Sequence, residues 1–124
     1  MRVVDSSGWL EVFVDGPLAD KYEKYLSDAS EVVTPTVVLY EVYKKIRREC
    51  SEEEALIAAA QIQKTHLVPL TEALALAAAD ISLEHRLAMV DSIVYATALS
   101  HRAQLISSDA DFARLPNVTY LATE

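Results

Sequence analysis

Short apolar runs alternate with longer amphipathic segments along the whole chain. The apolar runs are rich in β-branched residues and predict strands at 2–5, 31–34, 66–70, 104–107 and 118–121. The segments between them predict helices at about 7–13, 18–28, 36–48, 51–65, 72–85 and 91–101. Strands that alternate with helices favour a mainly parallel sheet covered on both faces. The pattern therefore predicts an α/β fold with about five strands.

Length and composition indicate one globular domain over residues 1–124. Hydrophobic residues make up 52% of the chain, yet no run approaches the roughly 18 apolar residues that a membrane span needs. Met1 and Arg2 lead straight into an apolar strand, so we expect no signal peptide and no membrane partner. The single cysteine, Cys50, cannot form an internal disulfide and fits a cytoplasmic location.

The formal net charge of −8 argues against a simple nucleic-acid-binding protein, because such proteins are usually basic. Net charge does not describe how the signs are distributed over the surface. Carboxylates gathered around a bound cation would be offset locally by that cation. The positions of the acids therefore matter more than their number.

Several acids occupy positions typical of a ligand site in such a fold. Asp5 ends the first strand, and Asp109 follows the strand 104–107. Ligands of parallel α/β sheets bind beyond the carboxyl ends of the strands. Asp91 begins the helix predicted from that residue. Glu41 stands within the apolar run "VVLYEVY", so its carboxylate lies either at the helix edge or buried beside a cation.

Each of these acids also has a purely structural interpretation. Asp5 and Asp91 could cap the helices that follow them. Asp109 could be a turn residue, and Asp111 could cap the short turn that contains Phe112. The sequence alone leaves both kinds of role open.

Three cations follow Glu41 on the same predicted helix face. Lys44, Lys45 and Arg48 stand three, four and seven residues after it. They could form a phosphate-binding strip that leads to the acids. They could equally form a solvated face in which Glu41 pairs with Lys45.

Four stretches together resemble the PIN-domain nucleases, and most closely the VapC toxins of prokaryotic toxin–antitoxin pairs. They are "VVDSSGWLEVF" (3–13), "TPTVVLYEVYKKI" (34–46), "VDSIVYATALSH" (90–101) and "LISSDADF" (105–112). The resemblance covers essentially the whole chain. It implies a three-layer α/β/α fold, an endoribonuclease that depends on Mg²⁺ or Mn²⁺, an RNA substrate and a cognate antitoxin protein.

The resemblance also assigns site residues. The catalytic, metal-binding carboxylates match Asp5, Glu41, Asp91 and Asp109. Supporting positions match Ser6, Ser107 and Asp111. Ser108 departs from the pattern, because many relatives carry a basic residue there. Mg²⁺ suits such a site because it is a hard cation that takes oxygen ligands and keeps several waters.

Two other functions remain possible on the same residues. A non-catalytic RNA-binding or scaffold module could be built on the same fold. A metal-dependent phosphatase could use Asp5 as its nucleophile, although such enzymes typically carry a second acid two residues on, where this chain has Ser7.

The helix 72–85 is apolar on more than one face, which indicates a core helix or a homodimer interface. The dimers known among VapC relatives favour the interface.

Overall fold

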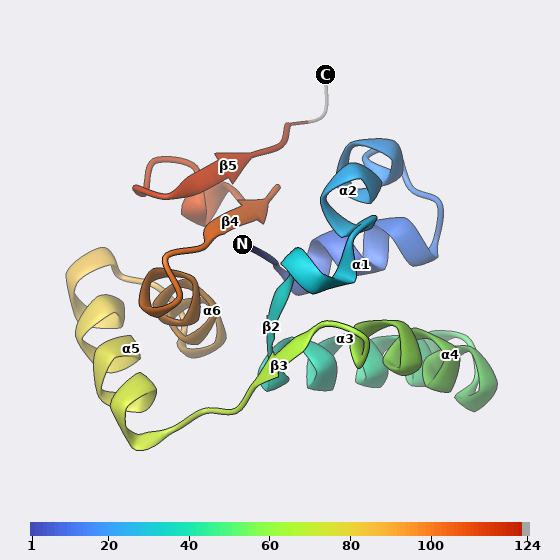
Figure 1. The fold of residues 1–124 in the computed structure, drawn as a ribbon, viewed down its shortest axis with the longest axis horizontal. Coiled ribbons are helices and arrows are strands. Elements are labelled where there is room, and N and C mark those ends of the chain that lie inside the picture. Colours follow the sequence, from blue (N-terminus) through green and yellow to red (C-terminus); the bar gives the residue numbers. More distant parts are fainter. Residues whose placement is uncertain (123–124) are drawn as a thin grey trace.

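The computed structural model describes residues 1–122, and its centre is a parallel sheet (Figure 1). The strands are β1 (Arg2–Val4), β2 (Val33–Pro35), β3 (His66–Val68), β4 (Gln104–Ser107) and β5 (Val118–Tyr120). One part of the sheet has the order β1-β4-β5, and the other pairs β2 with β3. A single parallel bridge between Arg2 and Val32 joins the two parts. The predicted five parallel strands are thus confirmed, in the order β3-β2-β1-β4-β5.

The central strands are covered on both faces. Val3 and Val4 of β1 are completely buried, as is Leu105 of β4, with Ile106 nearly so. Successive side chains of a strand point to opposite faces, so burial of consecutive residues requires a layer on each side. The edge strand β3 is more open, since His66 and Leu67 are exposed. These apolar runs without alternation are what a doubly covered sheet needs.

Within residues 1–122, six helices surround the strands in three packed pairs (Figure 1). They are α1 (Ser6–Phe13) with α2 (Ala19–Leu26), α3 (Thr36–Glu49) with α4 (Glu52–Ile62), and α5 (Glu72–His85) with α6 (Met89–Ser100). Short 3₁₀ turns η1 (Ala29–Glu31) and η2 (Ala110–Phe112) precede β2 and follow β4. Helices α2, α3 and α6 each contact strands of the sheet. The α/β fold class predicted from the sequence is confirmed.

Within residues 1–122, helices α1, α4 and α5 begin at a side-chain cap, whereas α2, α3 and α6 do not. Ser51 and Thr71 accept hydrogen bonds from backbone N–H groups at the starts of α4 and α5. Helix α6 begins at Met89, not at Asp91 as predicted, and its N-cap residue Ala88 supplies no side-chain hydrogen bond. Asp91 lies inside the first turn, so the interpretation of this residue as a helix cap is wrong.

Helix α5 is not a core helix. Only Leu74 and Ala78 are buried in it, whereas Leu76 and Leu83 are 72% and 83% exposed. Its buried side packs on α6. The opposite side leaves large apolar side chains in solvent. Exposed apolar surface of this kind is typical of sites that bind another protein. Within residues 1–122, no helix is both long enough and apolar enough to span a membrane.

Candidate metal centre and adjoining groove

The candidate site lies at the point in the sheet where the chain stops adding strands on one side of β1 and begins to add them on the other. From β1 the chain moves outward through β2 to β3, and then continues on the other side of β1 with β4 and β5. Ligands of open α/β sheets bind in the crevice at such a switch point, outside the carboxyl ends of the strands. Asp5 directly follows β1, and Asp109 lies two residues beyond β4. The topology therefore places both acids at this crevice.

Three carboxylates form the tightest group there. Asp91, Asp109 and Asp111 each offer an oxygen, and these oxygens lie within 4.8 Å of one another. The turn η2 holds two of them: the backbone N–H of Asp111 donates to Asp109 Oδ1 at 2.9 Å. Asp109 is thus the cap of this turn, and Asp111 is not. We call Asp91, Asp109 and Asp111 the acidic cluster.

Asp5 lies beside this cluster and is held by a defined set of donors. It is 6% exposed, and its Oδ1 accepts from Ser7 Oγ at 2.7 Å and from the Gly8 N–H at 3.2 Å. Its Oδ2 accepts from the hydroxyl of Ser107. Ser107 Oγ also accepts from the backbone N–H of Asp109 at 3.0 Å, so it ties the end of β1 to the turn after β4. Asp5 therefore does cap α1, as one sequence interpretation predicted.

The electrostatics of the site favour a cation. Burial raises the pKa of Asp5 above its ordinary value. Partial burial, reinforced by the negative charges of Asp109, Asp5, Asp111 and Glu41, raises the pKa of Asp91 to about 6. Among residues 1–122, no Lys, Arg or His forms an ion pair with any of these carboxylates. A divalent cation held by oxygen ligands would relieve this repulsion, so the donor set fits Mg²⁺ or Mn²⁺.

Glu41 connects the acids to a groove between α1 and α3. The α1–α3 groove has a volume of about 330 Å³ and is lined by Ser6, Ser7, Leu10, Tyr40, Glu41, Lys44, Lys45 and Arg48. Val42 and Ile46 turn into the core, which leaves Glu41 half-buried at the helix edge. Ser6 and Ser7 both line the groove, and of these two residues it is Ser7 whose hydroxyl donates to Asp5.

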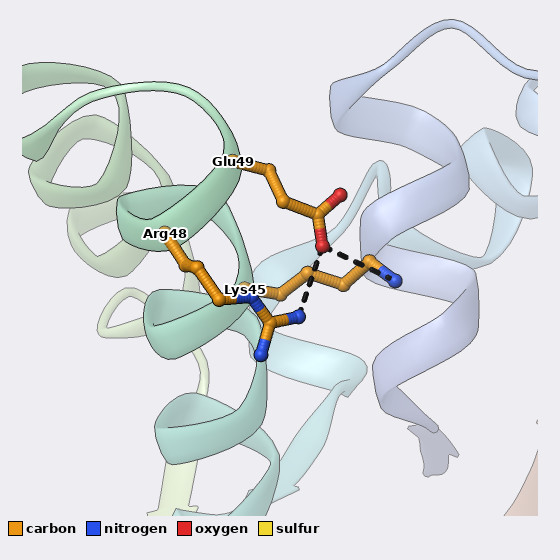
Figure 2. Close-up of polar contacts among 3 residues, drawn as sticks. All are labelled: Lys45, Arg48 and Glu49. Carbon is orange, nitrogen blue, oxygen red and sulfur yellow. Dashed lines mark hydrogen bonds and ion pairs between the residues drawn. The ribbon is translucent and has the colours of Figure 1, made fainter.

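The cations of the groove have partners other than Glu41. Figure 2 shows the side chains of Lys45 and Arg48 converging on the Glu49 carboxylate, at 3.7 Å and 3.0 Å from Oε2. The hydrogen bond from Arg48 lowers the pKa of Glu49 below its usual value. Lys44 lies over the ring of Tyr40, with Nζ 5.3 Å from the centroid. The interpretation in which Glu41 pairs with Lys45 is therefore wrong.

A second support of the acidic turn was not predicted. The Tyr22 hydroxyl donates to Ser108 Oγ at 2.8 Å, and burial raises the pKa of Tyr22 to about 12. The ring reaches this position because residue 8 is glycine: a Cβ there would lie 2.5 Å from Tyr22 Cε1. Ser108 thus serves as a partner of α2. The sequence places Tyr22 in the predicted helix 18–28 but carries no local signal that pairs it with Ser108.

Comparisons with known proteins agree with this architecture. The family model of the PIN domain matches residues 2–118. A toxin–antitoxin complex from Klebsiella pneumoniae is similar at a TM-score of 0.84 and 19% identity, covering 99% of this chain and 100% of that one. VapC20 of Mycobacterium tuberculosis, described as a toxin that cleaves the sarcin–ricin loop, reaches 0.78 at 20% identity, covering 99% and 98%.

VapBC2 from Rickettsia felis, solved with a DNA fragment from the promoter of the pair, has a TM-score of 0.75 at 11% identity and covers 99% and 98%. No protein of curated function matches the sequence. The matches confirm the resemblance seen in the four sequence stretches and the three-layer fold that it implied.

Proposed function

The chain belongs to the PIN-domain family, and from this premise we propose that it is a metal-dependent endoribonuclease. One observation carries the proposal. An acidic cluster without a cationic partner among residues 1–122 lies at the switch point of the sheet, beside a groove lined by three cations. The first feature suits a divalent cation, and the second suits the phosphates of a polynucleotide.

The acids have separate tasks in this proposal. Asp91, Asp109 and Asp111 would hold the ion, with Glu41 closing the site from α3. Asp5 contributes a carboxylate that Ser7 and Ser107 keep in one orientation. Bound Mg²⁺ or Mn²⁺ would lower the pKa of a ligated water and offset charge on the scissile phosphate. Attack by such a water on phosphorus would break the bond to the 3′ oxygen, which would take up a proton. The products would be a 5′-phosphate and a 3′-hydroxyl.

The groove supplies the path of the RNA strand. Lys44, Lys45 and Arg48 of α3 line it from one side and Ser6 from α1. A phosphate bound by these cations lies next to Glu41 on the same helix. The strip is short, and it is the basic counterpart of the acids in a chain whose net charge is −8. The RNA contacts therefore depend on local rather than net charge.

Two protein partners belong to the proposal. The similar structure from Klebsiella pneumoniae is a toxin–antitoxin complex and that from Rickettsia felis is VapBC2, so we propose that a cognate antitoxin, encoded next to this chain, binds and inhibits it. Co-purification with the product of the neighbouring reading frame tests this, and free activity in that mixture would contradict it.

The single cysteine, exposed and unpaired, agrees with a cytoplasmic location.

We also propose a homodimer through the α5–α6 face. Leu76, Leu83 and Met89 are exposed there, at 72%, 83% and 73%. Burying such side chains against a second copy would remove them from water. Sedimentation of the wild type and of Leu76→Glu tests the interface. A wild type that stays monomeric at high concentration would contradict it.

A cleavage assay tests the enzymatic proposal. Single-stranded RNA should be cut with Mn²⁺ or Mg²⁺ and left intact with a chelator, with 5′-phosphate and 3′-hydroxyl ends on the products. RNA binding without turnover would favour a non-catalytic module. Release of phosphate from small esters without RNA cleavage would favour a phosphatase that uses Asp5.

A further inference from the structure

Tyr40 is a large aromatic side chain in solvent at the α1–α3 groove. It is 61% exposed, whereas Trp9 packs on Phe13 and Tyr95 packs on Phe112. It directly precedes Glu41 on α3 and lines the groove together with the three cations. An aromatic ring that a protein leaves in water beside cationic side chains is typical of sites that bind nucleic-acid strands.

The Tyr40 ring is held in place by its own helix. Lys44 stands one turn further along α3, with its Nζ 5.3 Å from the ring centroid, and it donates to the Tyr40 hydroxyl at 3.3 Å. These two contacts restrict the ring without burying it. A ring fixed before its partner arrives loses less conformational entropy on binding than a freely rotating one. The exposed surface of the ring remains accessible to a planar ligand.

We propose that Tyr40 stacks one base of a single-stranded RNA whose neighbouring phosphates are bound by the groove cations. The proposal rests on the nuclease function proposed above. Lys44 would then make two contacts, with its aliphatic stem against the Tyr40 ring and its ammonium group toward a phosphate. Every base offers a π-face, so stacking anchors the strand with little sequence preference. A base-paired helix keeps its bases stacked on each other, and Tyr40 therefore favours unpaired nucleotides.

Binding of a labelled single-stranded RNA to the full chain in chelator tests the proposal without cleavage. Tyr40→Leu keeps an apolar side chain of good helix propensity but removes the ring, and we expect binding roughly 5- to 100-fold weaker. Tyr40→Phe keeps the ring and should bind within about twofold of the wild type, while Tyr40→Trp should bind at least as well. Equal binding by Tyr40→Leu and wild type would overturn the proposal, as would equal losses in Tyr40→Leu and Tyr40→Phe.

Two further measurements separate stacking from an indirect effect through Lys44. Removing bases one at a time from the RNA should reveal one position where the loss weakens wild-type binding and has no effect in Tyr40→Leu. The salt dependence should be unchanged in Tyr40→Leu, whereas displacement of Lys44 would lower the slope of log K against log salt by roughly 0.7. A slope reduced in this way, or base-removal penalties that are the same in both proteins, would overturn stacking.

The two proposals fail in different ways. A wild type that binds the RNA with this pattern but does not cleave it with Mn²⁺ would contradict the nuclease function and leave the stacking role standing. A wild type that cleaves, combined with a Tyr40→Leu variant that binds normally, would overturn stacking alone. A wild type that does not bind single-stranded RNA at all would overturn stacking directly.

Discussion

The acidic cluster and the cationic strip of α3 are built in opposite ways. The carboxylates of Asp91, Asp109 and Asp111 are crowded within 4.8 Å, and their charges oppose one another. The side chains of Lys45 and Arg48 are more than half exposed and share Glu49 as a counter-ion (Figure 2). One region holds like charges close together in the folded state, and in the other Glu49 offsets part of the charge of two cations on the same helix.

This difference indicates what each region can gain from a ligand. A cation entering the acidic cluster meets a site with no internal competitor, so its binding relieves repulsion. A phosphate approaching Lys45 or Arg48 has to compete with Glu49. We therefore expect changes in the acidic cluster to have large effects and changes in the strip to have small, salt-dependent ones.

The largest effect should come from Glu41→Gln, which keeps the size of the side chain and removes the charge that would hold the ion. Changes around metal ligands already cost 10- to 100-fold, so we expect loss of a ligand to lower kcat/KM at least about 100-fold. The fold should persist because the side chain of Glu41 makes no hydrogen bond within residues 1–122. Glu53→Gln, an exposed change on α4, is the matched control. Wild-type cleavage by Glu41→Gln at equal Mn²⁺ would remove Glu41 from the site.

The next largest effect should come from the three cations of α3, and it tests whether they bind the RNA strand. Replacing Lys44, Lys45 and Arg48 with Ala should weaken binding of single-stranded RNA. The slope of log K against log salt should fall by roughly 2, because each phosphate contact contributes roughly 0.7. Lys64→Ala, which removes one exposed cation outside the groove, should leave the slope as it is. An unchanged slope in the triple variant would make the strip an ordinary solvated surface.

Asp91→Asn tests whether charge repulsion within the acidic cluster lowers the free energy of unfolding. The pKa of Asp91 is about 6 in the folded state against an ordinary 3.8, so the folded state binds more protons between these values. Stability of the metal-free wild type should therefore fall as pH rises from about 4 to 6, and this loss should be smaller in Asp91→Asn. Burial also raises the pKa of Asp5, which leaves some pH dependence of the same sign in both proteins.

Thermal melts at pH 7.5 complete the test of Asp91. In chelator we expect Asp91→Asn, although inactive as a nuclease, to be at least as stable as the wild type. Mn²⁺ at ten times its dissociation constant should add about 1.4 kcal/mol to the wild type and much less to the variant, reversing their order. Equal stabilisation of both proteins by Mn²⁺ would place Asp91 outside the metal site.

The sequence predicted best what depends on neighbouring residues. The helix 72–85 and the strand 104–107 have the predicted bounds, because Thr71 caps the first and the apolar pair Leu105–Ile106 forms the centre of the second. The start of α6 was missed because Ala88 and Met89 carry no capping signal, whereas Asp91 imitates one. The unusual position of Glu41 in an apolar run was visible from the sequence, which left open whether it lay at the helix edge or buried beside a cation. The structure places it half-buried at the edge of α3.

The parts that escaped prediction depend on contacts between distant segments or on the choice among adjacent side chains. Tyr22 and Ser108 are 86 residues apart, and no local pattern pairs them. The choice of Ser7 over Ser6 as the donor to Asp5 depends on the direction of each side chain at the start of α1. The pairing of Lys45 with Glu49 was overlooked because Glu41 stands four residues before Lys45 and Glu49 four residues after it, so helical spacing does not choose between them.

The smallest expected effect is that of Glu49→Gln, which sharpens the contrast between the two regions from the cationic side. The change removes the shared counter-ion of Lys45 and Arg48 and frees both for phosphate. Since exposed ion pairs are weak, we expect RNA binding to tighten by only about two- to fivefold at low salt, and the gain to vanish at high salt. Titrations of labelled RNA at two salt concentrations measure this. In the background of Lys45→Ala and Arg48→Ala, the same substitution should retain only the weak effect of removing one negative charge. A full gain in that background would mean that Glu49 repels RNA directly, and weaker binding by Glu49→Gln would mean that its ion pairs position the strip rather than compete for it.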